Sequence, residues 1–113
     1  MPLRSELRRH VRVDIHRRAW CEHRDWTLYL PLGNVSHSGL FIQTSTLFPH
    51  GEQLRVCLSD REPVIVLDVE VVWASEPHPS VARALGVGCA ISSISQGADA
   101  YAALVEQLTL GAR

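Results

Sequence analysis

Several residue types are scarce in this 113-residue chain, and each scarcity excludes a class of protein. The three cysteines, Cys21, Cys57 and Cys89, are an odd number, lie far apart and form no CxxC pair. This spacing argues against a disulfide framework or a zinc site, so we expect three small buried apolar residues. No stretch approaches the roughly 18 consecutive apolar residues that a membrane helix needs.

The N-terminus is charged and leads into no apolar segment, so we expect no Sec signal, no membrane insertion and a cytoplasmic location. The composition is 46% hydrophobic and 20% charged. These values predict a globular protein with a single core, and we expect one domain over residues 1–113.

Lysine is absent, so all eleven basic side chains are arginines, and most of them are at one end. The first 24 residues hold seven arginines and three acids, a net charge of +4, whereas the remainder holds four arginines and nine acids, a net charge of −5. Duplex binding usually requires a basic face on the whole domain, so we expect no nucleic-acid partner. A small anionic ligand held by planar, bidentate guanidinium groups fits this distribution better.

Most of the chain has the alternating or valine-rich pattern of short β-strands. We expect strands within residues 11–15, 19–32, 40–44, 54–58, 64–73 and 84–91, the second with a bend. Clusters of turn residues separate several of them, notably Gly33–Gly39. About six short strands at this spacing predict a small closed antiparallel barrel.

Only the C-terminal segment has helical periodicity. Asp99 suits the first turn of a helix, and Gly111 suits its end. The single apolar stripe consists of Tyr101, Leu104, Val105 and Leu108. We therefore predict an arginine-rich flexible arm over residues 1–12, a barrel over 13–95 and a helix over 96–110.

Two motifs stand out from this background. Arg8-Arg9-His10-Val11-Arg12 has RxxxR spacing just before a strand, and Asn34-Val35-Ser36-His37-Ser38-Gly39 has NxSxxG spacing at a turn. Each motif alone is weak, because arginine runs are usually solvated and Asn-Ser-Gly turns are common. The pair, in this order and about 22 residues apart, is much more specific.

The pair of motifs resembles the PilZ domain family of bacterial cyclic di-GMP receptors. The resemblance covers nearly the whole chain, because Val71-Val72-Trp73, Gly86–Ile91 and the apolar helix look like the family's later elements. It implies an all-β fold, a six-stranded antiparallel β-barrel with a C-terminal α-helix. It also implies a cyclic di-GMP ligand, bound as a monomer or as an intercalated dimer.

The resemblance also identifies candidate ligand-binding residues. The matching positions are Arg8, Arg9, Arg12, Asn34, Ser36 and Gly39. A guanidinium group can bind phosphate oxygens or grip guanine O6 and N7. Asn34 can present its carbonyl to a guanine donor, and the Ser36 hydroxyl can bond base or phosphate. Gly39 would permit a positive φ and close approach of the ligand.

A few further residues have two open interpretations. His37 lies inside the second motif and is a candidate ligand contact. Trp73 can stack on a guanine, although a tryptophan in the barrel core is the more common case. Arg17 and Arg18 can add to the positive field, although solvated charges at a strand end are more common.

No catalytic constellation is visible, because the sequence contains no GxSxG elbow and no phosphate-binding P-loop. The six histidines are scattered without HxH or HExxH spacing. We therefore expect no enzyme, no metal and no cofactor.

The leading hypothesis is a cyclic di-GMP receptor that orders its N-terminal arm over the ligand and signals to an effector protein. The family resemblance implies control of bacterial motility, surface attachment and biofilm, or exopolysaccharide. One alternative is a PilZ-like protein-interaction module that does not bind nucleotide. Another is a barrel for single-stranded nucleic acid, ranked last because the arginine arm contains no interleaved aromatics. The oligomeric state is left open.

Overall fold

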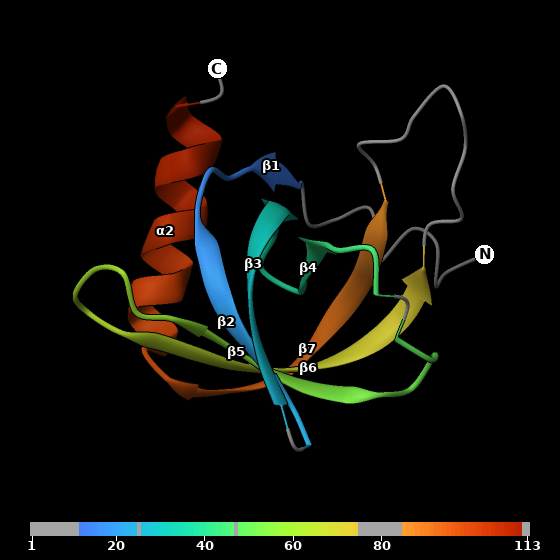
Figure 1. Cartoon of the computed structure of the whole chain (residues 1–113). Helices are drawn as coiled ribbons and strands as arrows, with labels where there is room; N and C mark the ends of the chain where they lie inside the picture. Colours follow the sequence, from blue (N-terminus) through green and yellow to red (C-terminus); the bar gives the residue numbers. More distant parts are fainter. Residues whose placement is uncertain (1–11, 25, 47, 75–84, 112–113) are drawn as a thin grey trace.

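The computed structural model describes residues 12–24, 26–46, 48–74 and 85–111, which form seven strands and one helix (Figure 1). Short strands follow one another along the chain before the helix, as the apolar pattern predicts. The elements are β1 (Val13–Asp14), β2 (Arg18–His23), β3 (Trp26–Val35), β4 (Gly39–Gln43), β5 (Gln53–Leu58), β6 (Ile65–Ala74), β7 (Gly86–Gln96) and α2 (Ala98–Gly111).

Six of the strands close into an antiparallel barrel. Their order is β3-β2-β5-β6-β7-β4, and pairing between β3 and β4 completes the circle. The two-residue β1 adds to β3, where Asp14 pairs with Asn34. The predicted six-stranded barrel with a C-terminal helix is therefore confirmed. Closure leaves no long unpaired strand edge within the ring.

The core consists of the inward-facing residues of the strands. In β6, Leu67, Val69 and Val71 are fully buried, and their neighbours in sequence are more exposed. Burying each such side chain contributes about 1.5–3 kcal/mol. Cys21 and Cys89 are buried free thiols, and this burial raises the pKa of each to about 12. Cys57 is only partly buried, so the prediction of three buried cysteines is right for two of them.

The predicted apolar stripe packs the helix against the barrel. Tyr101 and Val105 are buried, and Leu104 and Leu108 pack against the core at its margin. Gly97, with φ of 78°, joins β7 to the helix, and a Cβ there would lie 2.6 Å from the Val64 carbonyl oxygen. Only glycine fits this connection without strain. None of the described helical residues forms a span long and apolar enough to cross a membrane.

Several predicted boundaries are wrong. The segment 19–32 is not one strand but a hairpin, because His23 pairs with Trp26. Arg24 adopts a φ of 51° at the turn. The sequence Arg-Asp lacks the Asn-Gly or Asp-Gly signal that usually predicts a positive φ in a hairpin turn. The cluster 33–39 is a turn only after Val35, since β3 continues to that residue. Gly111 is the last residue of the helix rather than the one beyond it.

Candidate functional site

The turn from Ser36 to Gly39 joins β3 to β4 through a compact set of hydrogen bonds. The Ser36 amide donates to the Gly39 carbonyl at 2.8 Å. The Ser36 hydroxyl oxygen accepts from the amides of Ser38, at 3.3 Å, and Gly39, at 3.1 Å. Such a serine-centred turn satisfies backbone donors that would otherwise be buried without partners.

The Ser36 side chain is therefore part of the framework of the turn. The relative exposure of Ser36 is 2%, and among the described residues its hydroxyl group forms hydrogen bonds only within the turn. The buried Tyr101 hydroxyl of α2 donates to the Ser36 carbonyl oxygen at 2.7 Å. The C-terminal helix thus helps to hold the turn through the buried side chain of Tyr101.

Gly39 is required by packing rather than by its backbone angle. Its φ is not among the positive values of the described glycines, which belong to Gly51 and Gly97, so the expected positive φ is wrong. A Cβ on Gly39 would lie 2.5 Å from the Cys89 carbonyl oxygen on β7. The glycine thus permits β4 and β7 to approach closely.

Asn34 is partly buried at the end of β3, and its side chain is incompletely satisfied. Its Oδ1 atom is buried and has no hydrogen-bond partner among the described residues. A shift of register between Leu32 and Asn34 marks a bulge, a feature that commonly redirects side chains beside binding sites. A buried carbonyl left without a hydrogen-bond donor costs about 1–3 kcal/mol.

A row of paired residues crosses four strands at this point, and we call it the Asn34–Trp73 row. Asn34 in β3 pairs with Phe41 in β4, Phe41 with Gly88 in β7, and Gly88 with Trp73 in β6. The Phe41 and Trp73 rings stack with centroids 5.4 Å apart and planes 25° from parallel. A Cβ on Gly88 would lie 2.1 Å from the Trp73 ring, so only glycine allows this stack.

Trp73 is not a core residue. Its relative exposure is 41%, and the Arg12 guanidinium carbon lies 6.0 Å from its ring centroid. The cause is a second bulge, between Val71 and Trp73, which breaks the inward alternation of Val69 and Val71. Arg12 and Trp73 therefore form an exposed cation–π pair next to Phe41, the residue that pairs with Asn34.

The other residues predicted to bind ligand fall into three groups: some lie outside the described residues, some are exposed and some are buried. Arg8 and Arg9 lie outside the described residues. Arg12 is exposed on Trp73, and His37 is exposed in the turn. Of the second motif, Asn34 lies in the row, whereas Ser36 and Gly39 are buried beneath it. The structure thus brings Arg12 and Trp73 together and connects them to Asn34 through the pairings of Phe41 and Gly88.

A pocket of about 760 Å³ adjoins this region, and sequence reasoning missed it. Arg17 and Arg18 line it together with Asp14, Gly33 and Tyr29, among others. Asp14 pairs with Asn34, and Gly33 precedes it, so the pocket borders the Asn34–Trp73 row. Only the run of basic residues before and within β2 could have signalled it.

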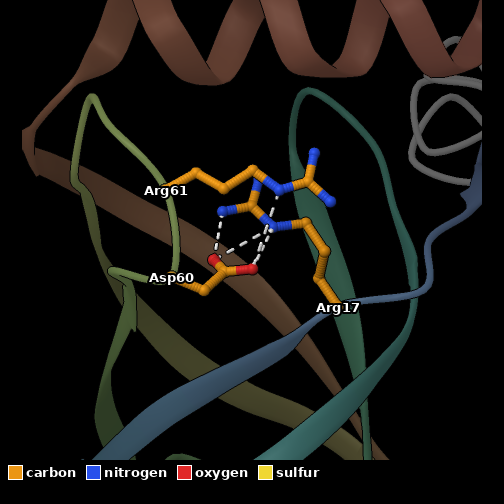
Figure 2. A network of polar contacts seen from close by, with 3 residues as sticks. All are labelled: Arg17, Asp60 and Arg61. Atoms are coloured by element: carbon orange, nitrogen blue, oxygen red, sulfur yellow. Dashed lines mark hydrogen bonds and ion pairs between the residues drawn. The ribbon is translucent and has the colours of Figure 1, made fainter.

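One wall of the pocket is fixed by an ion pair. Figure 2 shows the Arg17 guanidinium directed at the Asp60 carboxylate, with Arg61 beside it. The Arg17 side chain is only 9% exposed, so the expectation of a solvated charge is wrong for this residue. The hydrogen bond from Arg17 holds the pKa of Asp60 below its usual value. No group of His, Cys, Asp or Glu among the described residues is arranged to hold a metal ion.

Comparison with known proteins agrees with this architecture. The structure superposes on the Bacillus subtilis inhibitor of motility (MotI/DgrA) with a TM-score of 0.71 and 19% identity. The match covers 92% of this chain and 51% of that one, so the chain spans about half of that protein's length. No curated protein matches the sequence. The family model of the PilZ domain matches residues 6–109, and the chain therefore belongs to the PilZ domain family.

Proposed function

We propose that this chain is a cyclic di-GMP receptor that uses the Asn34–Trp73 row as its ligand platform. PilZ domains are generally receptor or adaptor modules for this nucleotide. The observation that carries the proposal is the buried Asn34 carbonyl, which has no partner among the described residues and lies in the row that ends at the exposed Arg12–Trp73 pair. An acceptor, a guanidinium group and an aromatic face are the groups that recognise a guanine nucleotide.

Each group has a distinct task in this proposal. Asn34 Oδ1 accepts a hydrogen bond from a guanine N–H, which satisfies the buried carbonyl. The Trp73 face stacks on a guanine ring, displacing or sharing its contact with Arg12. Arg8, Arg9 and Arg12 bind phosphate oxygens or the O6 and N7 edge. Ser36 and Gly39 hold the turn that positions Asn34, and His37 lies beside it.

The position of the arginine motif in the chain suggests how ligand binding is signalled to other proteins. The arginine motif precedes β1, so ligand binding orders residues 1–12 against the barrel. An effector protein then recognises the closed surface. Control of motility, attachment or exopolysaccharide is the corresponding cellular output. The fold shared with an inhibitor of motility is compatible with the first of these.

The test is calorimetric titration of the purified protein with cyclic di-GMP, with GTP as the competing nucleotide. Because a charge-assisted hydrogen bond contributes about 1.5–3 kcal/mol, Arg8→Ala and Arg12→Ala should each weaken binding roughly tenfold to a hundredfold. Arg55→Gln is the matched control, since Arg55 lies on β5 and bonds Asp68 rather than the row. The stoichiometry distinguishes one nucleotide from an intercalated pair.

Two outcomes would contradict the proposal. A folded wild-type protein that shows no saturable binding at high micromolar cyclic di-GMP is not a receptor, and the interaction-module alternative would then stand. Equal affinities for the wild type, Arg8→Ala and Arg12→Ala would move the site away from the arginine motif.

A further inference from the structure

The outer face of β2 has an unusual order of side chains. Ala19 and Cys21 point into the core, with relative exposures of 0% and 1%, and the alternate residues Arg18, Trp20 and Glu22 are exposed. A strand rises about 3.3 Å per residue, so the end positions lie about 13 Å apart. The strand therefore presents a cation, a large aromatic and an anion in a line.

The centre of this line belongs to a wider apolar band. Trp20 is 44% exposed and Tyr29 43%, and their ring centroids lie 4.7 Å apart. On the other side Trp20 pairs with Cys57, which pairs with Val66, and both are only partly buried. The band crosses β3, β2, β5 and β6. Exposed aromatics gathered in this way mark interaction surfaces.

The two charges that flank the band have no opposite charge of their own among the described residues. Arg18 lies over the Tyr29 ring and donates to the Tyr29 carbonyl oxygen at 3.3 Å. Glu22 pairs in register with Arg55, but the Arg55 guanidinium bonds Asp68 at 2.9 Å instead. That hydrogen bond is the main cause of the raised pKa of Arg55, and the charge of Glu22 is a minor one.

A second copy of the same face satisfies this pattern. A twofold axis through Trp20 places each Trp20 against its counterpart in the other copy. It also brings Arg18 of each copy opposite Glu22 of the other, so that one patch supplies both halves of the contact. Such self-complementarity is the requirement for a closed homodimer.

We propose that the β2 face, centred on Trp20, is a homodimer interface. The inference goes beyond the proposed function, because it requires no nucleotide. Arg18 and Tyr29 also line the pocket that borders the Asn34–Trp73 row, so the dimer contact adjoins that pocket. The other exposed tryptophans have different surroundings, since Trp26 stacks on Phe48 and Trp73 on Phe41.

The first test is sedimentation velocity over a wide concentration range, without nucleotide and with reductant. We expect a concentration-dependent dimer. Buried tryptophans dominate interface energetics, so Trp20→Ser should raise the dimer dissociation constant roughly tenfold or more. Leu110→Ser is the control, because it removes an exposed apolar side chain from the helix instead and should leave the dissociation constant unchanged. Circular dichroism confirms that both variants are folded.

The second test uses charge reversal and identifies the geometry. Arg18→Glu alone or Glu22→Arg alone places like charges together twice and should weaken the dimer. The double variant restores both pairs, and a mixture of the two single variants should form a heterodimer. A wild-type protein that is monomeric at all concentrations would overturn the proposal and leave this face for a different protein. A dimer insensitive to Trp20→Ser and to both reversals would overturn it equally.

Discussion

The two halves of the NxSxxG motif have opposite physical characters. Ser36 and Gly39 are buried and hydrogen-bonded to each other, and Gly39 lies close against β7. Asn34, two residues before Ser36, has a buried carbonyl without a partner in the described part of the chain and lies in a row that ends in the exposed Trp73. A short motif therefore contains both a hydrogen-bonded framework and a polar group left without a partner among the described residues, and mutations in the two halves should have different effects.

The largest effect is expected from Gly39→Ala. The new Cβ would lie 2.5 Å from the Cys89 carbonyl oxygen, and backbone must move to relieve the clash. Overpacking of this kind lowers the free energy of unfolding by about 1–3 kcal/mol. We expect a loss near the upper end of this range when the variant is unfolded with a chemical denaturant. Gly111→Ala is the control, since nothing lies within 4 Å of its added Cβ. Equal stabilities of the two variants would contradict the close approach of β4 and β7.

Ser36→Ala should have the next largest effect. It removes the acceptor for the amides of Ser38 and Gly39, and losing a buried partner costs about 1–3 kcal/mol. Unfolding free energies of wild type and variant measure this loss, with the exposed Ser59→Ala as control. A Ser36→Ala protein as stable as the wild type, but unable to bind nucleotide, would mean that the hydroxyl serves the ligand rather than the turn.

The smallest effect on stability is expected from the Arg17–Asp60 pair in the pocket wall, and this effect depends on pH. The pKa of Asp60 is held below its ordinary value of 3.8, chiefly by the Arg17 hydrogen bond. The unfolded chain therefore takes up the proton first as the pH falls. The stabilisation is complete above about pH 4 and is lost as the pH falls through the lower, folded pKa.

Because the pair is partly exposed, Asp60→Asn should cost at most about 1 kcal/mol at pH 7. Denaturation of wild type and variant at pH 7 and near pH 3 should show this difference shrinking in acid. A difference that is the same at both pH values would show that the charge of Asp60 is not its cause.

The regular parts of the fold were predictable because periodicity reports burial directly. The alternation in 54–58 and the stripe from Tyr101 to Leu108 correspond to β5 and α2. The sequence left Trp73 open between a guanine-stacking residue and a core residue, because its exposure comes from a bulge in β6, and a bulge depends on the partner strand as well as on local sequence. The pocket at Arg17 was not predicted for a related reason, because Asp60, the ion-pair partner of Arg17, is 43 residues away in the sequence.

The candidate site likewise contains some residues that the sequence identifies and some relations that depend on how the strands pair. Motif spacing identified Arg12 and Asn34, but only the registers between β3, β4, β7 and β6 connect Asn34 to Trp73. That the Asn34 carbonyl finds no donor among the described residues is a property of packing, which no sequence pattern encodes.

The most direct measurement is a paired determination of stability and cyclic di-GMP affinity for Asn34→Leu. Leucine has a similar size but removes the buried carbonyl, which has no partner in the described structure and whose burial costs about 1–3 kcal/mol. If Asn34 serves the ligand, affinity should fall roughly tenfold or more while the free energy of unfolding stays equal or rises. Unchanged affinity, or a loss of stability that accounts for the lost binding, would contradict the assignment of Asn34 to the ligand.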